Sequence, residues 1–347
     1  MDTARFITAF IIALAATAAL SPLARRAAWK LGLVDEPNPR RINKVPMPTG
    51  GGLAIFAGFL TASLVVGGEL PHLGVTALAA LLILVIGVLD DRFQLSAGVK
   101  FAGQFAAVLI YVIWGPRIEF LSNPLGGMFY LGKLAFPVTM LWVLTLINIM
   151  NFIDGIDGLT TGVSFIAAAA LAFLALLLER YDAALLAVIT GGAALGFLPY
   201  NFNPAKLYLG DGGAMLLGFL LAAISTEGAL KGAATISIAV PILILAVPVT
   251  DLLCAVVRRV QNGVPVYQAD RSHFHHRLLD LGLSQRQIAG LAYLITGVSA
   301  TMAVLTVHMA RATWLVALAL GLVFWYGSMR VGMIQPFGSH KGDNKDA

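Results

Sequence analysis

Residues 148–159 read Asn-Ile-Met-Asn-Phe-Ile-Asp-Gly-Ile-Asp-Gly-Leu and separate two apolar runs, 134–147 and 160–178. Two carboxamides, two carboxylates and two glycines therefore fall within a dozen residues. A carboxylate is costly in hydrocarbon and is tolerated where it meets water, a partner group or a cation. This pattern indicates a functional site at the junction of two membrane-crossing segments.

The polar side chains of this stretch would not converge if it formed one continuous helix. They belong to Asn148, Asn151, Asp154 and Asp157. At 100° per residue, these positions fan over about half of the helix circumference. The two Asp-Gly pairs favour a break, because glycine tolerates positive φ. We therefore expect the helix to end near Phe152 and the chain to loop at the membrane surface, where several polar groups can turn toward one point.

The composition of the whole chain supports a membrane location. Of its 347 residues, 59% are hydrophobic and only 12% are charged, with a mean hydropathy of +0.85. A soluble fold needs a more polar exterior than this composition provides. The single cysteine, Cys254, excludes an intrachain disulfide. The net charge of +5 follows membrane topology and does not indicate a nucleic-acid partner.

The apolar runs predict an all-α polytopic membrane protein, since a bilayer core of about 30 Å needs about 20 apolar residues per helix. We expect eleven spans, near residues 4–24, 50–67, 74–89, 99–114, 134–151, 160–178, 183–200, 211–226, 233–254, 288–308 and 311–332. Most of the basic residues then lie on one side, so the positive-inside rule places the N-terminus outside and the C-terminus in the cytoplasm. Residues 1–338 form a single domain in this interpretation, and residues 339–347 a disordered tail.

Two local features of these runs carry further predictions. Pro241 and Pro248 remove backbone donors inside the ninth span, which should kink it. Residues 119–132 mix aromatic side chains with Asn-Pro and Gly-Gly, a pattern that predicts a short hairpin on the external side.

Polar segments gather on the predicted cytoplasmic side. They span residues 35–52, 90–96, 148–159, 201–213 and 258–286. The loops on the opposite side are short and hold no comparable cluster. The sequence therefore predicts that the chemistry takes place at the cytoplasmic interface.

The acidic residues of these segments allow a functional and a structural interpretation. Adjacent Asp90 and Asp91 repel each other unless a cation or a shared proton relieves them, but they could also form an ordinary helix end with Arg92 as a local partner. Asp211 lies among glycines in Tyr-Leu-Gly-Asp-Gly-Gly at a helix start. It could be a simple N-cap, or the glycines could let phosphate approach the helix N-terminus.

The basic segments point to phosphate. The histidine segment could bind a transition metal through His273, His275 and His276. The flanking arginines, among them Arg277, favour a phosphate-binding patch instead. A solvated loop is the third option. Lys44 lies in a proline-rich basic loop that could equally anchor anionic lipid heads. Hard carboxylate ligands for Mg²⁺ together with basic donors for phosphates indicate phosphoryl transfer at a membrane surface.

These residues resemble the motifs of the polyprenyl-phosphate N-acetylhexosamine-1-phosphate transferases. The matching motifs are Asp90-Asp91, Asn148-x-x-Asn151-x-x-Asp154-Gly-x-Asp157-Gly-Leu, Leu209-Gly-Asp211-Gly-Gly, His273-x-His275-His276 and the first loop at residues 35–48. They occur in order over residues 30–290. The histidine motif and the Arg-Leu-Leu-Asp-Leu-Gly-Leu that continues it are similar to the bacterial branch that makes undecaprenyl-diphospho-GlcNAc for O-antigen, enterobacterial common antigen or teichoic-acid linkage.

The resemblance implies that undecaprenyl phosphate attacks the β-phosphorus of UDP-GlcNAc and releases UMP, with Mg²⁺, or alternatively Mn²⁺, as cofactor. It implies that Asp90 is the base or orienting group, that Asp91 supports the metal site, and that Asp211 and Asn151 hold the metal. The residues it assigns to nucleotide, sugar or phosphates are Asn148, Asp154, Asp157, Lys44, Lys100, His273, His275, His276 and Arg277. The partners are UDP-GlcNAc, undecaprenyl phosphate and the lipid bilayer of the bacterial cytoplasmic (inner) membrane, with no nucleic acid; whether the chain forms a homodimer stays open.

Two alternatives stand beside this interpretation. The same chemistry could act on another UDP-HexNAc or on UDP-MurNAc-pentapeptide. A protein of another class, an ion-coupled membrane transporter, would also contain intramembrane acids. Transporter sites usually lie near the bilayer midplane on broken helices, whereas the acids here lie at helix ends on one face.

Overall fold

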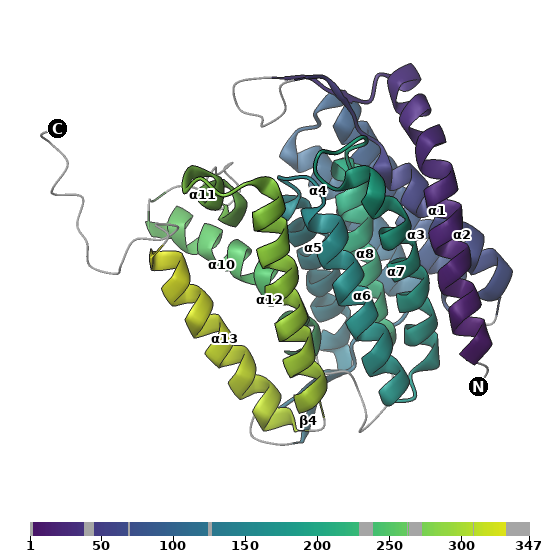
Figure 1. Ribbon diagram of the computed structural model, residues 1–347. Coiled ribbons are helices and arrows are strands. Elements are labelled where there is room, and N and C mark those ends of the chain that lie inside the picture. The colour runs from purple at the N-terminus through teal and green to yellow at the C-terminus, as the bar shows by residue number, and fades with distance from the viewer. Residues whose placement is uncertain are drawn as a thin grey trace, which may run out of the picture.

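The computed structural model describes residues 3–37, 45–68, 70–123, 127–228, 239–261, 263, 273–307 and 309–330, and within them the chain is a helical bundle with two short β-hairpins (Figure 1). The helices are α1 (Thr3–Leu31), α2 (Gly51–Val66), α3 (Leu73–Phe93), α4 (Ala97–Trp114), α5 (Ala135–Ile153), α6 (Leu159–Leu177), α7 (Tyr181–Asn201), α8 (Gly210–Gly228), α9 (Ala239–Ile244), α10 (Ala246–Gln261), α11 (Phe274–Asp280), α12 (Gln285–Thr306) and α13 (Ala310–Arg330). The hairpins pair β1 (Val34–Asp35) with β2 (Met47–Pro48), and β3 (Phe120–Ser122) with β4 (Met128–Tyr130).

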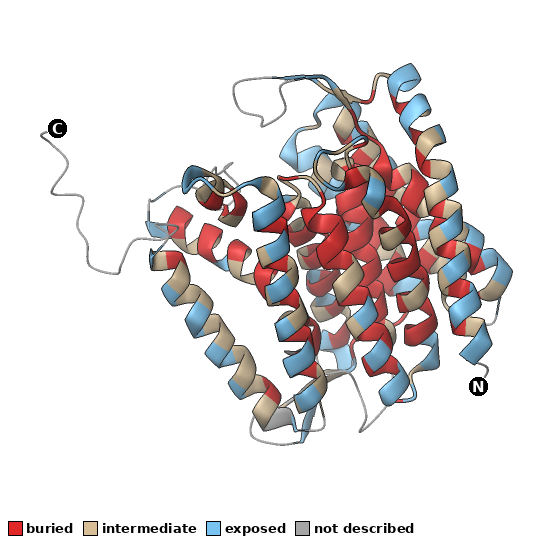
Figure 2. Cartoon of the chain, viewed as in Figure 1, coloured by how far each residue is buried: buried red, intermediate tan, exposed pale blue. Residues whose placement is uncertain are grey.

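Helix α8 is the centre of the bundle. It contacts α2, α3, α5, α6 and α7, and nearly all of its side chains are buried. A helix that is apolar on all sides must be enclosed by other helices or by lipid. Figure 2 shows the buried residues gathered in the middle of the bundle, while α13 is mostly intermediate or exposed and the outer side of α1 is mostly exposed.

Glycines let the N-terminal end of α8 approach its neighbours closely. A Cβ at Gly87 on α3 would overlap the backbone of Gly212, and a Cβ at Gly52 on α2 would overlap the backbone of Gly213. Small residues at helix crossings are the usual means of close packing in membrane proteins, where van der Waals contact holds helices together. These contacts place Asp211, in the first turn of α8, beside the C-terminal end of α3.

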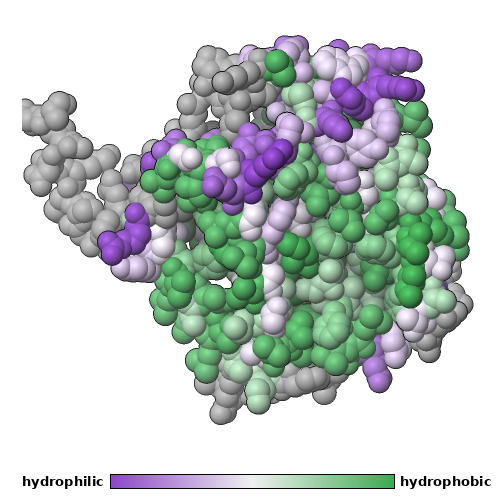
Figure 3. Space-filling model, viewed as in Figure 1, coloured by the Kyte–Doolittle hydropathy of each residue, from purple (hydrophilic) through white to green (hydrophobic). Residues whose placement is uncertain are grey.

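The described helices are those of a multi-pass membrane protein. Eight of them are long and apolar enough to cross a bilayer: α1, α3, α4, α6, α7, α12, the segment Gly132–Ile153 that includes α5, and the segment Ala312–Arg330 of α13. Hydrophobic residues cover the middle of the bundle and hydrophilic residues gather mainly at its upper end (Figure 3). The remaining predicted spans correspond to α2 (16 residues), α8 and the pair α9–α10. The count of eleven and the orientation stay predictions.

The ninth predicted span is interrupted at one residue, within the stretch that its prolines were predicted to kink. Helix α9 ends at Ile244 and α10 begins at Ala246. Pro248 has no N–H, so the carbonyl four residues earlier, at Ile244, loses its helical partner. Helix α10 contacts α5, α12 and α13 and runs at a steep angle to the bundle axis (Figure 1).

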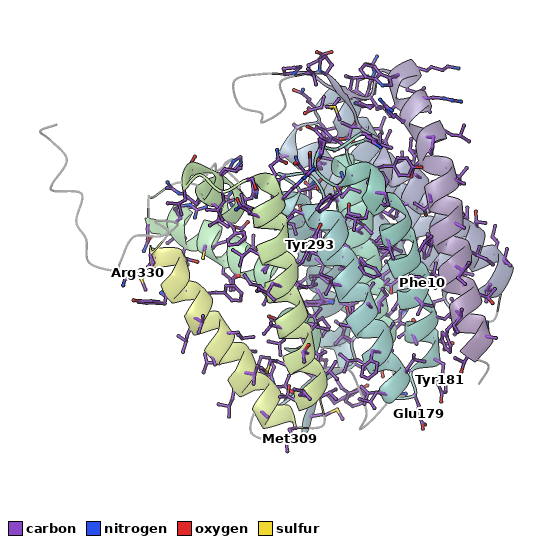
Figure 4. The ribbon with its side chains drawn as sticks, viewed as in Figure 1. Phe10, Glu179, Tyr181, Tyr293, Met309 and Arg330 are labelled. Carbon is purple, nitrogen blue, oxygen red and sulfur yellow. The ribbon has the colours of Figure 1, made fainter. Side chains whose placement is uncertain are left out.

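Helix ends differ from the predicted limits where charged residues continue the helix. Helix α1 extends past the predicted end at residue 24 to Leu31, and α3 extends past residue 89 to Phe93. Asp90 and Asp91 therefore belong to the last turns of α3. The predicted hairpin at 119–132 is confirmed as β3–β4, at the same end of the bundle as Glu179, Tyr181 and Met309 (Figure 4). The predicted tail at 339–347 lies outside the described residues.

Candidate active site

A cavity of about 430 Å³ opens at the end of the bundle where α3, α5 and α7 end and α4, α6, α8 and α12 begin. Residues from all five predicted polar segments line it. They are Val34, Asp35, Thr49, Asp90, Asp91, Gln94, Leu95, Asp154, Gly155, Ile156, Asp157, Asn201, Tyr208, Leu209, Gly210, Asp211, His276 and Gln285. The prediction that these segments meet on one face is confirmed.

The ammonium group of Lys100 is the centre of the polar contacts behind the cavity wall. Its Nζ lies 2.7 Å from Asp90 Oδ2 and 2.9 Å from Asp211 Oδ2, and it donates to Asn151 Oδ1 at 2.8 Å. Asn151 Nδ2 in turn donates to Asp211 Oδ1 at 2.8 Å. An ammonium has three donors, and here all three meet oxygens from α3, α5 and α8. One positive charge thus holds two carboxylates together.

The two adjacent acids of α3 have different partners. Asp91 accepts hydrogen bonds from the backbone N–H groups of Asp211 (2.9 Å) and Gly212 (3.3 Å), so it caps the N-terminus of α8 from another helix. A carboxylate is favourable there because it satisfies orphan donors at the positive end of the helix dipole. Asp90 accepts from Leu95 N at 2.8 Å as well as from Lys100.

The observed contacts do not agree with the two structural alternatives for these acids, a helix end paired with Arg92 and a simple N-cap at Asp211. Arg92 donates to the carbonyl oxygen of Gly32 at 2.8 Å, which ties α3 to the end of α1. The carboxylate of Asp211 bonds to Lys100 and Asn151, and its backbone N–H is capped by Asp91. The glycines of this turn pack against α2 and α3.

A second polar layer lies one helical turn deeper, on α4, α5 and α8. Asn148 Nδ2 donates to Gln104 Oε1 at 2.9 Å, and Gln104 Nε2 donates to Met215 Sδ at 2.9 Å. Gln104 follows Lys100 by four positions, and Met215 follows Asp211 by four. Asn148 precedes Asn151 by three. Side chains at these spacings lie on the same face of a helix. Gln104 is fully buried. Asn148 therefore contacts this supporting layer and does not line the cavity.

The loop between α5 and α6 begins where the sequence predicted. Helix α5 ends at Ile153, Asp154 is its C-cap, and Gly158 precedes α6 with φ of 78°. A positive φ is unfavourable for a residue that has a Cβ, so glycine at position 158 makes the turn possible. Asp154 is half-buried beside the cavity, and burial raises the pKa of its carboxyl to about 7.

Asp157 holds neighbouring loops together at the cavity wall. Its Oδ2 accepts from Asn203 Nδ2 (2.9 Å) and from the N–H of Ala205 (3.0 Å), and its own N–H donates to Gln285 Oε1 (3.0 Å). Tyr293 on α12, labelled in Figure 4, donates to the carbonyl oxygen of Gly158 at 2.6 Å. The start of α12 thus fixes the loop that carries both predicted acids.

The three histidines have separate environments. His276 lines the cavity, whereas His273 and His275 are buried and do not line it. A Cβ at Gly155 would overlap the imidazole of His275, so that ring lies directly on the loop at 154–157. Burial, with the nearby His276, lowers the pKa of His275 to about 3 and keeps its ring neutral. Of the remaining predicted phosphate ligands, Arg277 does not line the cavity and Lys44 lies outside the described residues.

Residues beyond the predicted set also shape the site. Asp35, Asn201, Tyr208 and Gln285 line the cavity, although no motif assigned a role to their side chains. Asp251 on α10 binds the start of the histidine segment. The sequence does contain a signal for Asp251, because an ionisable residue inside a predicted span is a functional candidate by default.

The lining chemistry fits a divalent cation. Among the described lining residues six are aspartates and none is lysine or arginine. No group of three or more His, Cys, Asp or Glu side chains in the described part of the chain could by itself hold a metal ion. Mg²⁺ does not require such a cage, because it usually binds through one or two carboxylates plus substrate phosphates. Asp211 and Asp90 offer such carboxylates at the cavity.

Fold and site together define a multi-pass membrane protein with an acidic cavity at one end of its bundle. The family model described as Glycosyl transferase family 4 matches residues 73–229. A probable undecaprenyl-phosphate N-acetylglucosaminyl 1-phosphate transferase of Bacillus subtilis is 39% identical over 84% of this chain and 82% of its own length. A decaprenyl-phosphate N-acetylglucosaminephosphotransferase of Mycobacterium tuberculosis is 36% identical over 85% of this chain and 80% of its own length. An undecaprenyl-phosphate alpha-N-acetylglucosaminyl 1-phosphate transferase of Escherichia coli is 30% identical over 81% of this chain and 78% of its own length.

The chain belongs to the polyprenyl-phosphate N-acetylhexosamine-1-phosphate transferase family, and it is a glycosyl-1-phosphate transferase. The resemblance drawn from the motifs is thereby confirmed.

Proposed function

We propose that the chain transfers GlcNAc-1-phosphate from UDP-GlcNAc to undecaprenyl phosphate, giving undecaprenyl-diphospho-GlcNAc and UMP, as the first membrane step of a cell-envelope polysaccharide in the bacterial inner membrane. The observation that carries the proposal is the meeting of Asp90, Asp211 and Asn151 around Lys100 at a cavity lined by all five polar segments. The names of the relatives support GlcNAc as the sugar and a polyprenyl phosphate as the acceptor.

An oxygen of the lipid phosphate attacks the β-phosphorus of UDP-GlcNAc, and the bond from this phosphorus to the bridging oxygen breaks to release UMP. In phosphoryl transfer, catalysis is mostly positioning and charge neutralisation. Asp90 orients or deprotonates the attacking phosphate, and Lys100 neutralises charge between Asp90 and Asp211. Asp91 acts indirectly, since it holds the turn that presents Asp211.

A divalent cation is needed to bring a diphosphate into this cavity, because six aspartates line it and no described lysine or arginine does. Asp211, with Asn151 beside it, would hold Mg²⁺, which supplies charge neutralisation for the diphosphate oxygens. Asp154, Asp157 and His276 line the part of the cavity left for the nucleotide and sugar.

The purified protein in detergent should release UMP from UDP-GlcNAc only when both Mg²⁺ and a polyprenyl phosphate are present. Competition of UDP-GlcNAc with other UDP-HexNAc sugars and with UDP-MurNAc-pentapeptide identifies the donor. A preference for the pentapeptide would overturn the proposed donor, and ion flux without UMP release would support a transporter.

A further inference from the structure

Asp251 is a buried carboxylate of α10 that the transfer mechanism does not use. It is only 3% exposed and lies 22 residues before its partner His273. Its Oδ2 is 2.8 Å from His273 Nδ1, and its Oδ1 accepts from the backbone N–H of Phe274 at 2.7 Å. A buried carboxylate is costly unless it is paired and hydrogen-bonded, and both of its oxygens are engaged here.

The two contacts of Asp251 fix the start of α11. Helix α11 begins at Phe274, and its N-cap residue, His273, makes no side-chain capping bond of its own. The capping oxygen comes instead from α10. Because one carboxylate holds both the cap side chain and the first helical N–H, it sets the position and the rotation of this short helix.

The far side of α11 meets the cavity. His275 lies against Gly155, and His276 lines the cavity together with Asp154 and Asp157. The rings of His273 and His275 are parallel, with centroids 6.1 Å apart, and the rings of His275 and His276 have centroids 4.3 Å apart. A displacement of α11 would therefore move the wall beside the loop at residues 154–157.

We propose that Asp251 is a positioning residue for the nucleotide-sugar part of the site: it acts through His273 and Phe274 to hold His276 at the cavity. This inference rests on the proposed transfer reaction for its kinetic part only. Asp251 does not line the cavity, so its effect must pass through α11.

The test compares Asp251→Ala and Asp251→Asn with Asp280→Asn, which changes an exposed aspartate at the end of α11. Asp251→Ala should raise the KM for UDP-GlcNAc about 10-fold or more, the usual effect of losing an outer partner of a site, and leave the KM for polyprenyl phosphate unchanged. Asp251→Asn should show a smaller rise, since its amide oxygen can still accept from Phe274. Backbone hydrogen exchange should accelerate at residues 274–280 in Asp251→Ala.

Kinetics and exchange in Asp251→Ala that match those of Asp280→Asn would overturn the proposal. So would an equal rise of both KM values with a lower melting temperature in Asp251→Asn, because that pattern indicates general loss of fold. If the wild-type protein released no UMP, the proposed function would fail, while the exchange measurement would still decide whether Asp251 holds α11.

Discussion

At the scale of single residues, the chemistry of the site depends on which side chain of each motif lines the cavity. The motifs predicted that Asp90 and Asp211 belong to the same site, but their connection through Lys100 needs α3, α4 and α8 to meet. The sequence could not separate the three histidines either, because their roles depend on α10 and on Gly155. A lone acid, such as Asp251, carries a weaker signal than clustered ones.

His275 gives a prediction for acid stability. Burial lowers the pKa of His275 from 6.5 to about 3, so between these values the unfolded state binds a proton that the folded state does not. The free energy of unfolding must therefore fall as the pH decreases below about 6.5. The loss caused by His275 is about 2 kcal/mol at most at pH 5. Above a pH of about 6.5, this group causes no change of stability with pH.

Thermal unfolding at pH 5 and pH 7.5 checks this expectation. The wild-type protein should lose more stability between these two conditions than His275→Gln does. Equal losses in the two proteins would mean that His275 is not kept neutral by burial.

At the scale of helices, the site depends on how closely α8 approaches α2 and α3. Apolar runs predicted the helices, and the prolines predicted a kink in the segment that the structure divides into α9 and α10. The central place of α8 was not predictable, because all the apolar runs look alike in sequence and only tertiary contacts distinguish an enclosed helix from one that faces lipid. The same limitation applies to helix ends, where α1 and α3 continue through charged residues.

Gly87→Ala tests the crossing of α3 and α8. The added Cβ would overlap the backbone of Gly212, so the helices must separate at the turn that carries Asp211. We expect a loss of about 1–3 kcal/mol of stability, typical of overpacking, together with reduced transferase activity.

Gly74→Ala is the matched control, because Gly74 lies on the same helix and a Cβ there meets nothing within 4 Å. It should be neutral or slightly stabilising, as alanine favours helix over glycine. If both variants behaved alike in melting temperature and turnover, the close crossing would not matter for the site.

At the scale of the whole molecule, the distribution of charge predicts one cytoplasmic face. Hydropathy and charge asymmetry are sufficient for this prediction because the bilayer constrains every span in the same way. The number of spans is harder to predict, since α2 is short and α9–α10 is broken.

Cysteine labelling tests the orientation. In a Cys254→Ser background, Glu179→Cys in the exposed turn after α6 should react with an impermeant thiol reagent in intact cells. Asp280→Cys, at the end of α11, should react only after the membrane is permeabilised. The reverse pattern would invert the topology and place the cavity outside.

If phosphoryl transfer takes place in the cavity that holds Asp211, the variant Asp211→Ala should lose UMP release. Asp182→Ala is its control, because Asp182 also lies in the first turn of a helix but at the other end of the bundle. With Mg²⁺, UDP-GlcNAc and polyprenyl phosphate present, Asp211→Ala should lose at least about 100-fold in kcat while remaining folded, and Asp182→Ala should keep its activity. Near-normal UMP release by folded Asp211→Ala would mean that phosphoryl transfer does not depend on Asp211.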